Sequence, residues 1–194
     1  MLMKRVSARA APSGISLEDI TVPALICASW SDHGMHTRGS FEGFKRISSA
    51  QKWVYTHGQP KWHVYYSDEA KAVQTAFFDH FLKGEDNGLD QRPPVRLEVR
   101  ETLSEYSVRY EQTWPLASTV ATPFYLGFDR RLEEAPMASA RTETYEAGEG
   151  AVAFRKTFTE DTELTGNMKL KLWVEAEGAK DMDLFVAIKK YDAD

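Results

Sequence analysis

Hydrophobic and polar residues follow two different patterns along this chain, and the change falls near residue 90. Before it, continuous apolar runs alternate with apolar stripes of helical spacing. After it, apolar and polar residues alternate at every second position over short segments. The first pattern predicts buried parallel strands joined by amphipathic helices, and the second predicts the half-buried strands of a β-sandwich.

Two apolar runs predict the strands of the first half. Residues 23–30 have the continuous hydrophobic character of a strand buried on both faces, and residues 52–56 form a shorter strand. Asp32 follows the first run and His57 follows the second. If the two strands are parallel, both side chains lie at the carboxyl edge of the sheet, where open α/β sheets place their chemistry. We therefore expect an acid and an imidazole that meet in space.

Two amphipathic segments predict helices that pack on this sheet. Phe41, Phe44 and Ile47 recur every three residues and predict a helix over residues 37–49. The second segment, residues 67–83, begins with a serine that can cap a helix and is followed by a glycine that can end it. Its broad aromatic face requires a large partner surface, which we expect to be the sheet.

The turn-rich, acidic residues 85–94 are predicted to be a linker. We therefore divide the chain into residues 1–84, the C-terminal part of an α/β domain with two parallel strands, and residues 95–194, an all-β sandwich or jelly roll that is incomplete. A two-stranded sheet leaves unpaired edges, so we expect the chain to be a fragment of a longer protein. The strands predicted after the linker are residues 95–100, 107–111, 123–128, 142–146, 151–159, 168–176 and 183–190.

The composition and charge of the chain limit the kinds of partner and compartment that we expect. The formal net charge is −5 and the pI is near 5.6, so no basic surface indicates nucleic acid, and no apolar run is long enough to span a bilayer. The N-terminal residues lack the apolar core of a signal peptide. The single cysteine, Cys27, lies in the first apolar run and is expected to be a small buried hydrophobe. We expect a cytoplasmic protein, unless an upstream segment carries a signal, and we leave a homo-oligomer open.

Asp32 and His57 are the candidate catalytic residues. In a nucleophile–histidine–acid triad the carboxylate orients the imidazole, which acts as general base and acid. The order of acid before histidine, each after a strand, is that of α/β-hydrolases. The sequence contains no G-x-S-x-G nucleophile elbow. Ser40 follows a glycine, but it lies within a predicted helix and is not expected to be the nucleophile.

A metal site is the weaker alternative for these residues. Asp32, His33, His36 and His57 offer oxygen and nitrogen ligands suited to zinc or manganese, but no second group of His or Cys residues accompanies them. Loop histidines that line a cleft explain this set better. The acidic pair in residues 181–183 lacks the other ligands of a calcium loop. We therefore expect no metal and no other cofactor.

Two tryptophans are candidates for substrate binding. Trp30 lies just before Asp32 and Trp62 lies just after His57. Aromatic side chains are more often part of a core or an interface than of a binding site. Among the aromatic residues of this half, these two are nevertheless the best placed to line a pocket.

The chain resembles the cocaine-esterase and X-prolyl dipeptidyl-peptidase family of serine hydrolases over nearly its whole length from about Leu17. The matching stretches occur in the order of the family. They are ITVPALICASWSDH, KWVYTHGQPKW, AFFDHFLKGEDNGL, PPVRLEVRE, WPL, TPFYLGF and TELTGNMKLKLWVEAEGAKDMDLFVAI.

The resemblance implies an α/β-hydrolase domain with a helical cap, followed by a jelly-roll domain. It implies that Asp32 is the triad acid and His57 the triad histidine, while the nucleophilic serine and the oxyanion tyrosine lie upstream of this chain. The residues that lead to His57, Tyr55 and Thr56, depart from the family's proline and tryptophan. The implied activity is that of an esterase, acylase or Xaa-Pro dipeptidyl-peptidase on small esters, amides or peptides. The alternative is a non-catalytic jelly-roll module that binds carbohydrate or another subunit.

Overall fold

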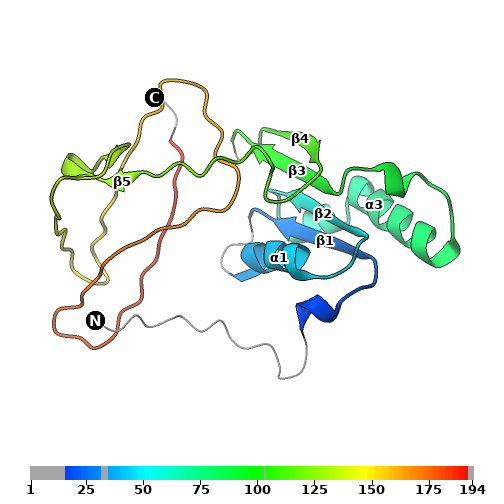
Figure 1. The fold of residues 1–194 in the computed structure, drawn as a ribbon, viewed down its shortest axis with the longest axis horizontal. Coiled ribbons are helices and arrows are strands. Elements are labelled where there is room, and N and C mark those ends of the chain that lie inside the picture. The colour runs from blue at the N-terminus through cyan, green and yellow to red at the C-terminus, as the bar shows by residue number, and fades with distance from the viewer. Residues whose placement is uncertain (1–15, 32–34, 103, 192–194) are drawn as a thin grey trace.

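A mixed four-stranded sheet organises the first part of the molecule (Figure 1). The computed structural model describes residues 16–31, 35–102 and 104–191. The sheet has the order β1-β2-β3-β4, where β1, β2 and β3 are parallel and β4 is antiparallel to β3. The four strands are β1 (Ala24–Ser29), β2 (Lys52–His57), β3 (Val95–Arg100) and β4 (Tyr106–Glu111).

The strands β1 and β2 confirm the two predicted from the apolar runs, but the prediction of a two-stranded sheet is wrong. β3 pairs in parallel with β2 through Val54↔Val95 and Tyr55↔Arg96, so the strand after the predicted linker extends the same sheet. The predicted linker, residues 85–94, contains one turn of 3-10 helix at Leu89–Gln91. The division of the chain into domains at this segment stays a prediction.

The helices begin close to the predicted positions. They are α1 (Met35–Arg46), α2 (Lys61–Tyr65) and α3 (Asp68–Phe78), and a turn of π-helix at Asp79–Lys83 continues α3. Ser67 caps α3 as predicted, because its hydroxyl accepts a hydrogen bond from the Ala70 amide at 3.2 Å. The helix ends at Gly84, whose φ of 74° is accessible to glycine. The short helix α2 was not among the predicted elements.

One face of the sheet carries the hydrophobic core. Side chains alternate along a strand, so the even-numbered residues of β1 and β2 share a face with the odd-numbered residues of β3. Helix α1 covers this face (Figure 1). The rings of Trp30 and Phe41 stack with centroids 5.0 Å apart, and Phe41 stacks on Trp114 at 4.5 Å. The buried members of this core are Ala28, Phe41, Phe44, Val54, Val95, Leu97, Trp114 and Leu116.

Helix α3 covers part of the opposite face. Trp53 of β2 contacts Phe77 of α3 and Phe81 of the π-helical turn, with ring centroids 6.2 and 5.9 Å apart. Arg96 of β3 forms an ion pair with Glu69 of α3 at 2.7 Å. The sheet is therefore covered by helices on both faces, and its carboxyl edge carries the residues described below.

Most of the strands predicted after residue 111 are not formed. β5 (Tyr125–Leu126) pairs with β6 (Leu132–Glu133), and Arg131 makes an isolated bridge to Arg155. Within residues 134–191 the structure assigns no extended strand, so the predictions for residues 142–146, 151–159, 168–176 and 183–190 are wrong here. A strand needs the N–H and C=O groups of a neighbour, and these segments run as separate extended chains (Figure 1). Their alternating apolar side chains are mostly exposed.

Across residues 16–31, 35–102 and 104–191, no helix combines the length and the apolar character needed to cross a membrane.

Candidate functional site

His57 is the last residue of β2 and lies buried at the carboxyl edge of the parallel strands. It pairs with Ser29 in the register of β1 and β2, so the two side chains lie on the same face of the sheet. The Trp30 amide donates to the His57 carbonyl oxygen at 2.7 Å. The chain that leaves β1 is therefore attached to the backbone of His57.

The imidazole of His57 is held in one orientation by the turn that follows it. Its Nδ1 lies 3.0 Å from the carbonyl oxygen of Gln59. A carbonyl oxygen only accepts, so Nδ1 carries the hydrogen and the lone pair of the neutral ring lies on Nε2. Burial lowers the pKa of His57 and the charge of Arg96 lowers it further, while the hydrogen bond to Gln59 has the opposite effect. The lowered pKa favours the neutral form of His57, which is the form that a general base requires.

Ser31 ties the segment that leads to Asp32 to the turn after His57. Its hydroxyl lies 2.8 Å from the carbonyl oxygen of Gly58 and 2.9 Å from that of Gln59, and it shares its single hydrogen between them. Asp32 follows Ser31 in the sequence. Asp32 itself lies outside the described residues, so its pairing with His57 stays a prediction.

A hollow of about 670 Å³ lies beside His57. Its lining is largely apolar and comes from strands β1 and β2 and from helices α1, α2 and α3. Tyr55 forms part of its floor, and burial raises the pKa of this phenol to about 12. Such a surface suits an uncharged organic group next to a base. Its lining residues include Leu25, Ser29, Tyr55, His57, Trp62 and Val73.

The two candidate tryptophans lie on opposite sides of the sheet. Trp62 of α2 lines the hollow beside His57. The ring of Trp30 instead packs in the core, and its Nε1 donates to the Glu98 carbonyl oxygen at 2.9 Å. In this structure Trp30 therefore does not line this hollow, because it is one position out of phase with Ser29 along the chain, and its role in substrate binding stays a prediction. The role of Trp62 in substrate binding stays a prediction.

Two other small polar residues also face the hollow. Cys27 is exposed rather than buried, because β1 is the edge strand of the described sheet and the hollow lies over it. Ser40 lies within α1, and its hydroxyl donates to the His36 carbonyl oxygen at 3.0 Å. A serine inside a helix and bonded to its backbone lacks the strained strand-to-helix turn of a nucleophile elbow.

The structure describes two of the four residues of the metal-site alternative. His36 and His57 both line the hollow. No group of three or more His, Cys, Asp or Glu side chains within the described ranges could hold a metal ion. Asp32 and His33, the other two residues of that alternative, lie outside those ranges.

Two buried charged residues of β3, Arg96 and Glu98, contact β2 next to His57, and the sequence pattern did not predict these contacts. The Arg96 guanidinium lies 4.1 Å from the ring centroid of Tyr55 and donates to the Thr56 carbonyl oxygen at 2.7 Å. The Glu98 amide donates to the Thr56 hydroxyl at 2.7 Å. The alternating pattern of β3 predicted that these charged side chains face solvent. The ion pair of Arg96 with Glu69 shows that α3 covers Arg96 instead, while the Glu98 side chain lies against Gly58 in the turn after His57.

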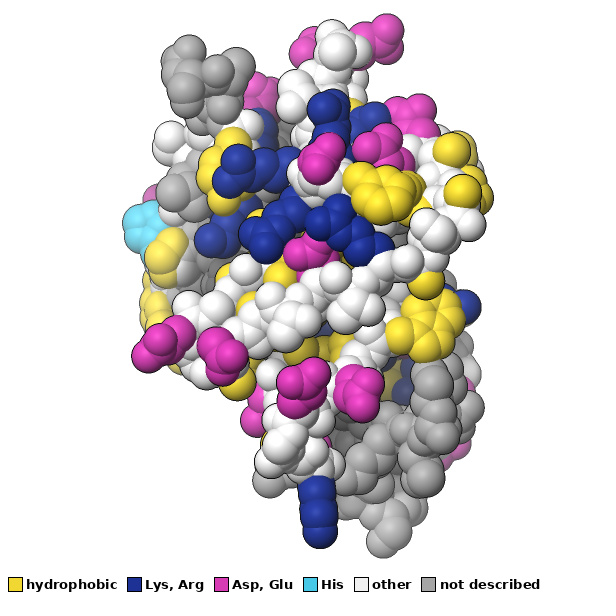
Figure 2. All heavy atoms as spheres, turned by 90° about the vertical axis from the view of Figure 1, so that its left-hand side faces the viewer, with side chains coloured by type: hydrophobic (Ala, Val, Ile, Leu, Met, Phe, Trp, Pro, Cys, Tyr) yellow, Lys and Arg dark blue, Asp and Glu magenta, His cyan; other side chains and the backbone are white. Residues whose placement is uncertain are grey.

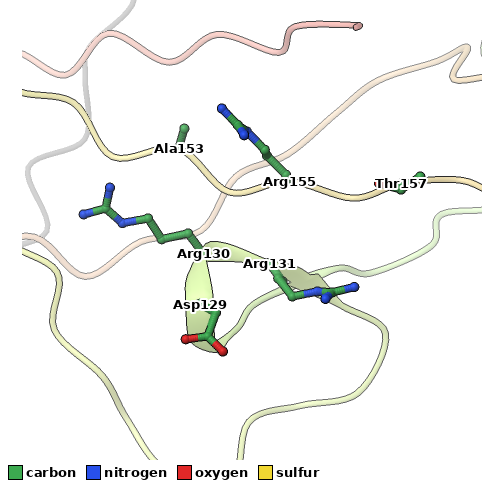
Figure 3. Close-up of a pocket in the computed structure, with 6 residues that line it drawn as sticks. All are labelled: Asp129, Arg130, Arg131, Ala153, Arg155 and Thr157. Carbon is green, nitrogen blue, oxygen red and sulfur yellow. The ribbon is translucent and has the colours of Figure 1, made fainter. Parts of the chain in front are cut away.

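A second hollow, of about 570 Å³, lies near β6. Figure 2 shows Lys and Arg side chains gathered on the side of the molecule where β5 lies. The hollow is lined by Arg130, Arg131 and Arg155, which are all exposed, and the guanidinium group of Arg131 extends away from that of Arg130 (Figure 3). Its lining contains no imidazole, thiol or buried carboxylate. The hollow beside His57 is therefore the better candidate for chemistry.

Comparison with known proteins identifies relatives for both parts of the chain. The family model described as the X-Pro dipeptidyl-peptidase C-terminal non-catalytic domain matches residues 87–194. The cocaine esterase of Rhodococcus sp. (strain MB1 Bresler) is 34% identical over 124 residues, which cover 57% of this chain and 21% of the esterase. Two crystal structures of a CocE/NonD family hydrolase from Staphylococcus aureus each superpose with a TM-score of 0.62, at 41% and 40% identity.

The chain spans only about a fifth of these relatives. The superposed region covers 63% and 64% of this chain but 22% and 23% of the two staphylococcal chains. The resemblance inferred from the sequence motifs is thus confirmed by a family match, a curated relative and solved structures. The chain is similar to the cocaine esterase and to the CocE/NonD hydrolases, and it belongs to the family of the X-Pro dipeptidyl-peptidase C-terminal non-catalytic domain.

Proposed function

We propose that this chain supplies the acid and the histidine of a Ser-His-Asp triad in a serine hydrolase, whose nucleophilic serine lies in a part of the protein before this chain. The observation that carries the proposal is the parallel register of β1 and β2, which brings the chain leaving β1 to the backbone of His57. The lowered pKa of His57 and the Nδ1 hydrogen bond, which leaves the lone pair of the neutral ring on Nε2, support it. The relatives named above are hydrolases or an esterase.

In this proposal each residue has one role. Asp32 accepts a hydrogen bond from Nδ1–H of His57, alongside the Gln59 carbonyl oxygen, and stabilises the imidazolium that forms during attack. Nε2 of His57 takes the proton from the serine hydroxyl and later gives it to the leaving group. Ser31 holds the turns that carry the two residues together.

The proposed substrates are small esters or amides, including those of esterases, acylases and Xaa-Pro dipeptidyl-peptidases. The apolar hollow beside His57 supports an uncharged acyl or aromatic group, and Trp62 at its edge offers a stacking surface. The name of the rhodococcal relative, an esterase, favours the ester class.

A second function is proposed for the residues that follow the predicted linker. The matching family is described as non-catalytic, which favours a binding or scaffolding role for residues 87–194. Carbohydrate or another subunit is the proposed ligand. This function is supported if residues 87–194 bind a member of a glycan panel or the catalytic portion of the protein. It is opposed if they bind neither.

The triad is tested in the full-length protein with a p-nitrophenyl ester. Asp32→Asn and His57→Ala should each lower kcat by about 10⁴-fold, since removal of a triad member typically has this effect. Asp86→Asn, which removes the charge of an exposed acid outside the hollow, is the control and should retain turnover. The isolated chain should show no turnover. Near-native rates in either triad variant, or serine-dependent turnover by the chain alone, would refute the proposal.

A further inference from the structure

The end of β2 that carries His57 departs from a regular ladder with β3. The Val54 amide donates to the Pro94 carbonyl oxygen at 2.8 Å, so the even-numbered residues of β2 direct their backbone groups toward β3. Two residues further on, a regular parallel ladder would have the Glu98 amide donate to the Thr56 carbonyl oxygen. That amide instead donates to the Thr56 hydroxyl at 2.7 Å. The Thr56 carbonyl oxygen is therefore left for another donor.

The side chain of Arg96 supplies that donor. Its Nη1 donates to the Thr56 carbonyl oxygen at 2.7 Å, and this oxygen belongs to the peptide bond that joins Thr56 to His57. The same guanidinium group lies 4.1 Å from the ring centroid of Tyr55. Tyr55 lies at the floor of the hollow, and its ring centroid is 6.4 Å from that of His57. Arg96 thus contacts both residues that precede His57.

Helix α3 holds the guanidinium group from its other side. Nη2 of Arg96 forms an ion pair with Glu69 at 2.7 Å, and only 8% of Arg96 is exposed. A planar guanidinium group whose two terminal nitrogens bind different elements is held in one orientation. Ala70, the residue after Glu69, lines the hollow. Arg96 therefore links the strand end that carries His57 to the helix that lines the hollow.

We propose that Arg96 is a positioning residue for His57. Its guanidinium group bridges Glu69 of α3 and the Thr56 carbonyl oxygen, and it thereby fixes the strand end that presents the imidazole to the hollow. Its role in catalysis rests on the proposed function, in which His57 is the general base. The fixing of the strand end is a property of this chain and can be measured without turnover.

The role in catalysis is tested with the full-length protein and a p-nitrophenyl ester. Arg96→Met keeps an unbranched side chain beside Tyr55 but removes both polar contacts. It should lower kcat by about 10–100-fold, since a misplacement of about 1 Å can cost a factor of about 10². KM should change by less than about threefold, because the interaction acts on the chemical step. Arg96→Lys keeps the charge but not the fork that reaches two partners, and it should recover only part of the loss.

Two controls separate positioning from general effects. Arg92→Met makes the same chemical change at an exposed arginine and should retain kcat. Phe44→Leu removes part of a buried ring on the other face of the sheet, and should lower the free energy of unfolding without lowering kcat. Near-native kcat in Arg96→Met would overturn the proposal, and so would an equal loss in Phe44→Leu. If Arg96→Met does not fold, native kcat in Arg96→Lys overturns it.

The positioning itself is tested by NMR spectroscopy of the 194-residue chain. The ¹³C shift of the Thr56 carbonyl reports its hydrogen bond, and the ¹⁵N shifts of the His57 ring report the imidazole. At about pH 8 the imidazole is neutral in every variant, so the lost charge of Arg96 does not change its protonation. Arg96→Met should shift both signals, and Arg92→Met should leave both native. A native His57 ring in Arg96→Met would overturn the proposal.

The two proposals fail in different ways. Native turnover in His57→Ala together with shifted signals in Arg96→Met would contradict the triad and leave the positioning intact. Loss of turnover in His57→Ala together with native signals and native kcat in Arg96→Met would contradict the positioning and leave the triad intact.

Discussion

The alternating segments of this chain have similar apolar patterns but differ in whether their apolar side chains are buried. Leu97 of β3 is 0% exposed in the core, whereas Leu170, in a segment with the same alternation, is 50% exposed. The difference lies in the partners. Strands β1–β4 each pair with a neighbour, and α1 and α3 pack on the sheet that they form, while residues 134–191 include no extended strand.

This contrast shows what an alternating pattern predicts. It indicates which side chains of a segment would be buried if a partner were present, and it does not supply that partner. In the first half, each partner lies within a few tens of residues along the chain. Where a segment of the second half has no strand paired with it, its apolar side chains and its backbone N–H and C=O groups are exposed to water.

Hydrogen exchange should show the largest difference between the two halves. The amides of β2 and β3 are hydrogen-bonded in the sheet and should exchange at least about a thousand times more slowly than those of residues 168–176. Residue-resolved NMR or mass spectrometry of the isolated chain measures both in one sample. Equal protection in residues 168–176 would show that this segment pairs in solution and would remove the contrast.

Matched leucine substitutions should give the next largest effect. Leu97→Ala empties a fully buried site and should lower the free energy of unfolding by about 2–5 kcal/mol. Leu172→Ala makes the same chemical change at a side chain that is 42% exposed, and should change it by less than about 0.5 kcal/mol. Urea denaturation followed by the fluorescence of the core tryptophans measures both variants. A similar loss in the two variants would place Leu172 in a core.

Much of the first half could be predicted because its signals are local. The apolar runs predicted β1 and β2, the three-residue spacing of Phe41, Phe44 and Ile47 predicted α1, and the capping serine predicted the start of α3. The position of His57 at a strand end followed from the same runs. The acid of the candidate pair, Asp32, lies outside the described residues and stays a prediction.

The features that were missed depend on contacts between distant segments. Nothing local to residues 95–100 predicts that β3 joins β2. Arg96 and Glu98 were expected at the solvent face of a half-buried strand, yet α3 and the turn after His57 cover them. The direction of the Trp30 side chain could have been predicted: a residue next to Ser29 faces the other side of the sheet, away from His57.

The smallest expected effect is the contribution of His57 to the pH dependence of folding. Burial lowers the pKa of this imidazole below its unfolded value of about 6.5, so the unfolded chain binds the proton more readily. The free energy of unfolding should therefore fall as the pH drops from about 6.5 through the lower pKa of the folded state, and should not depend on this group at higher pH. His57→Gln should remove that part of the decrease. The exposed His63→Gln is the control and should leave the profile unchanged. Urea midpoints measured between pH 5 and 8 test both variants, and an unaltered slope in His57→Gln would contradict a buried, neutral imidazole.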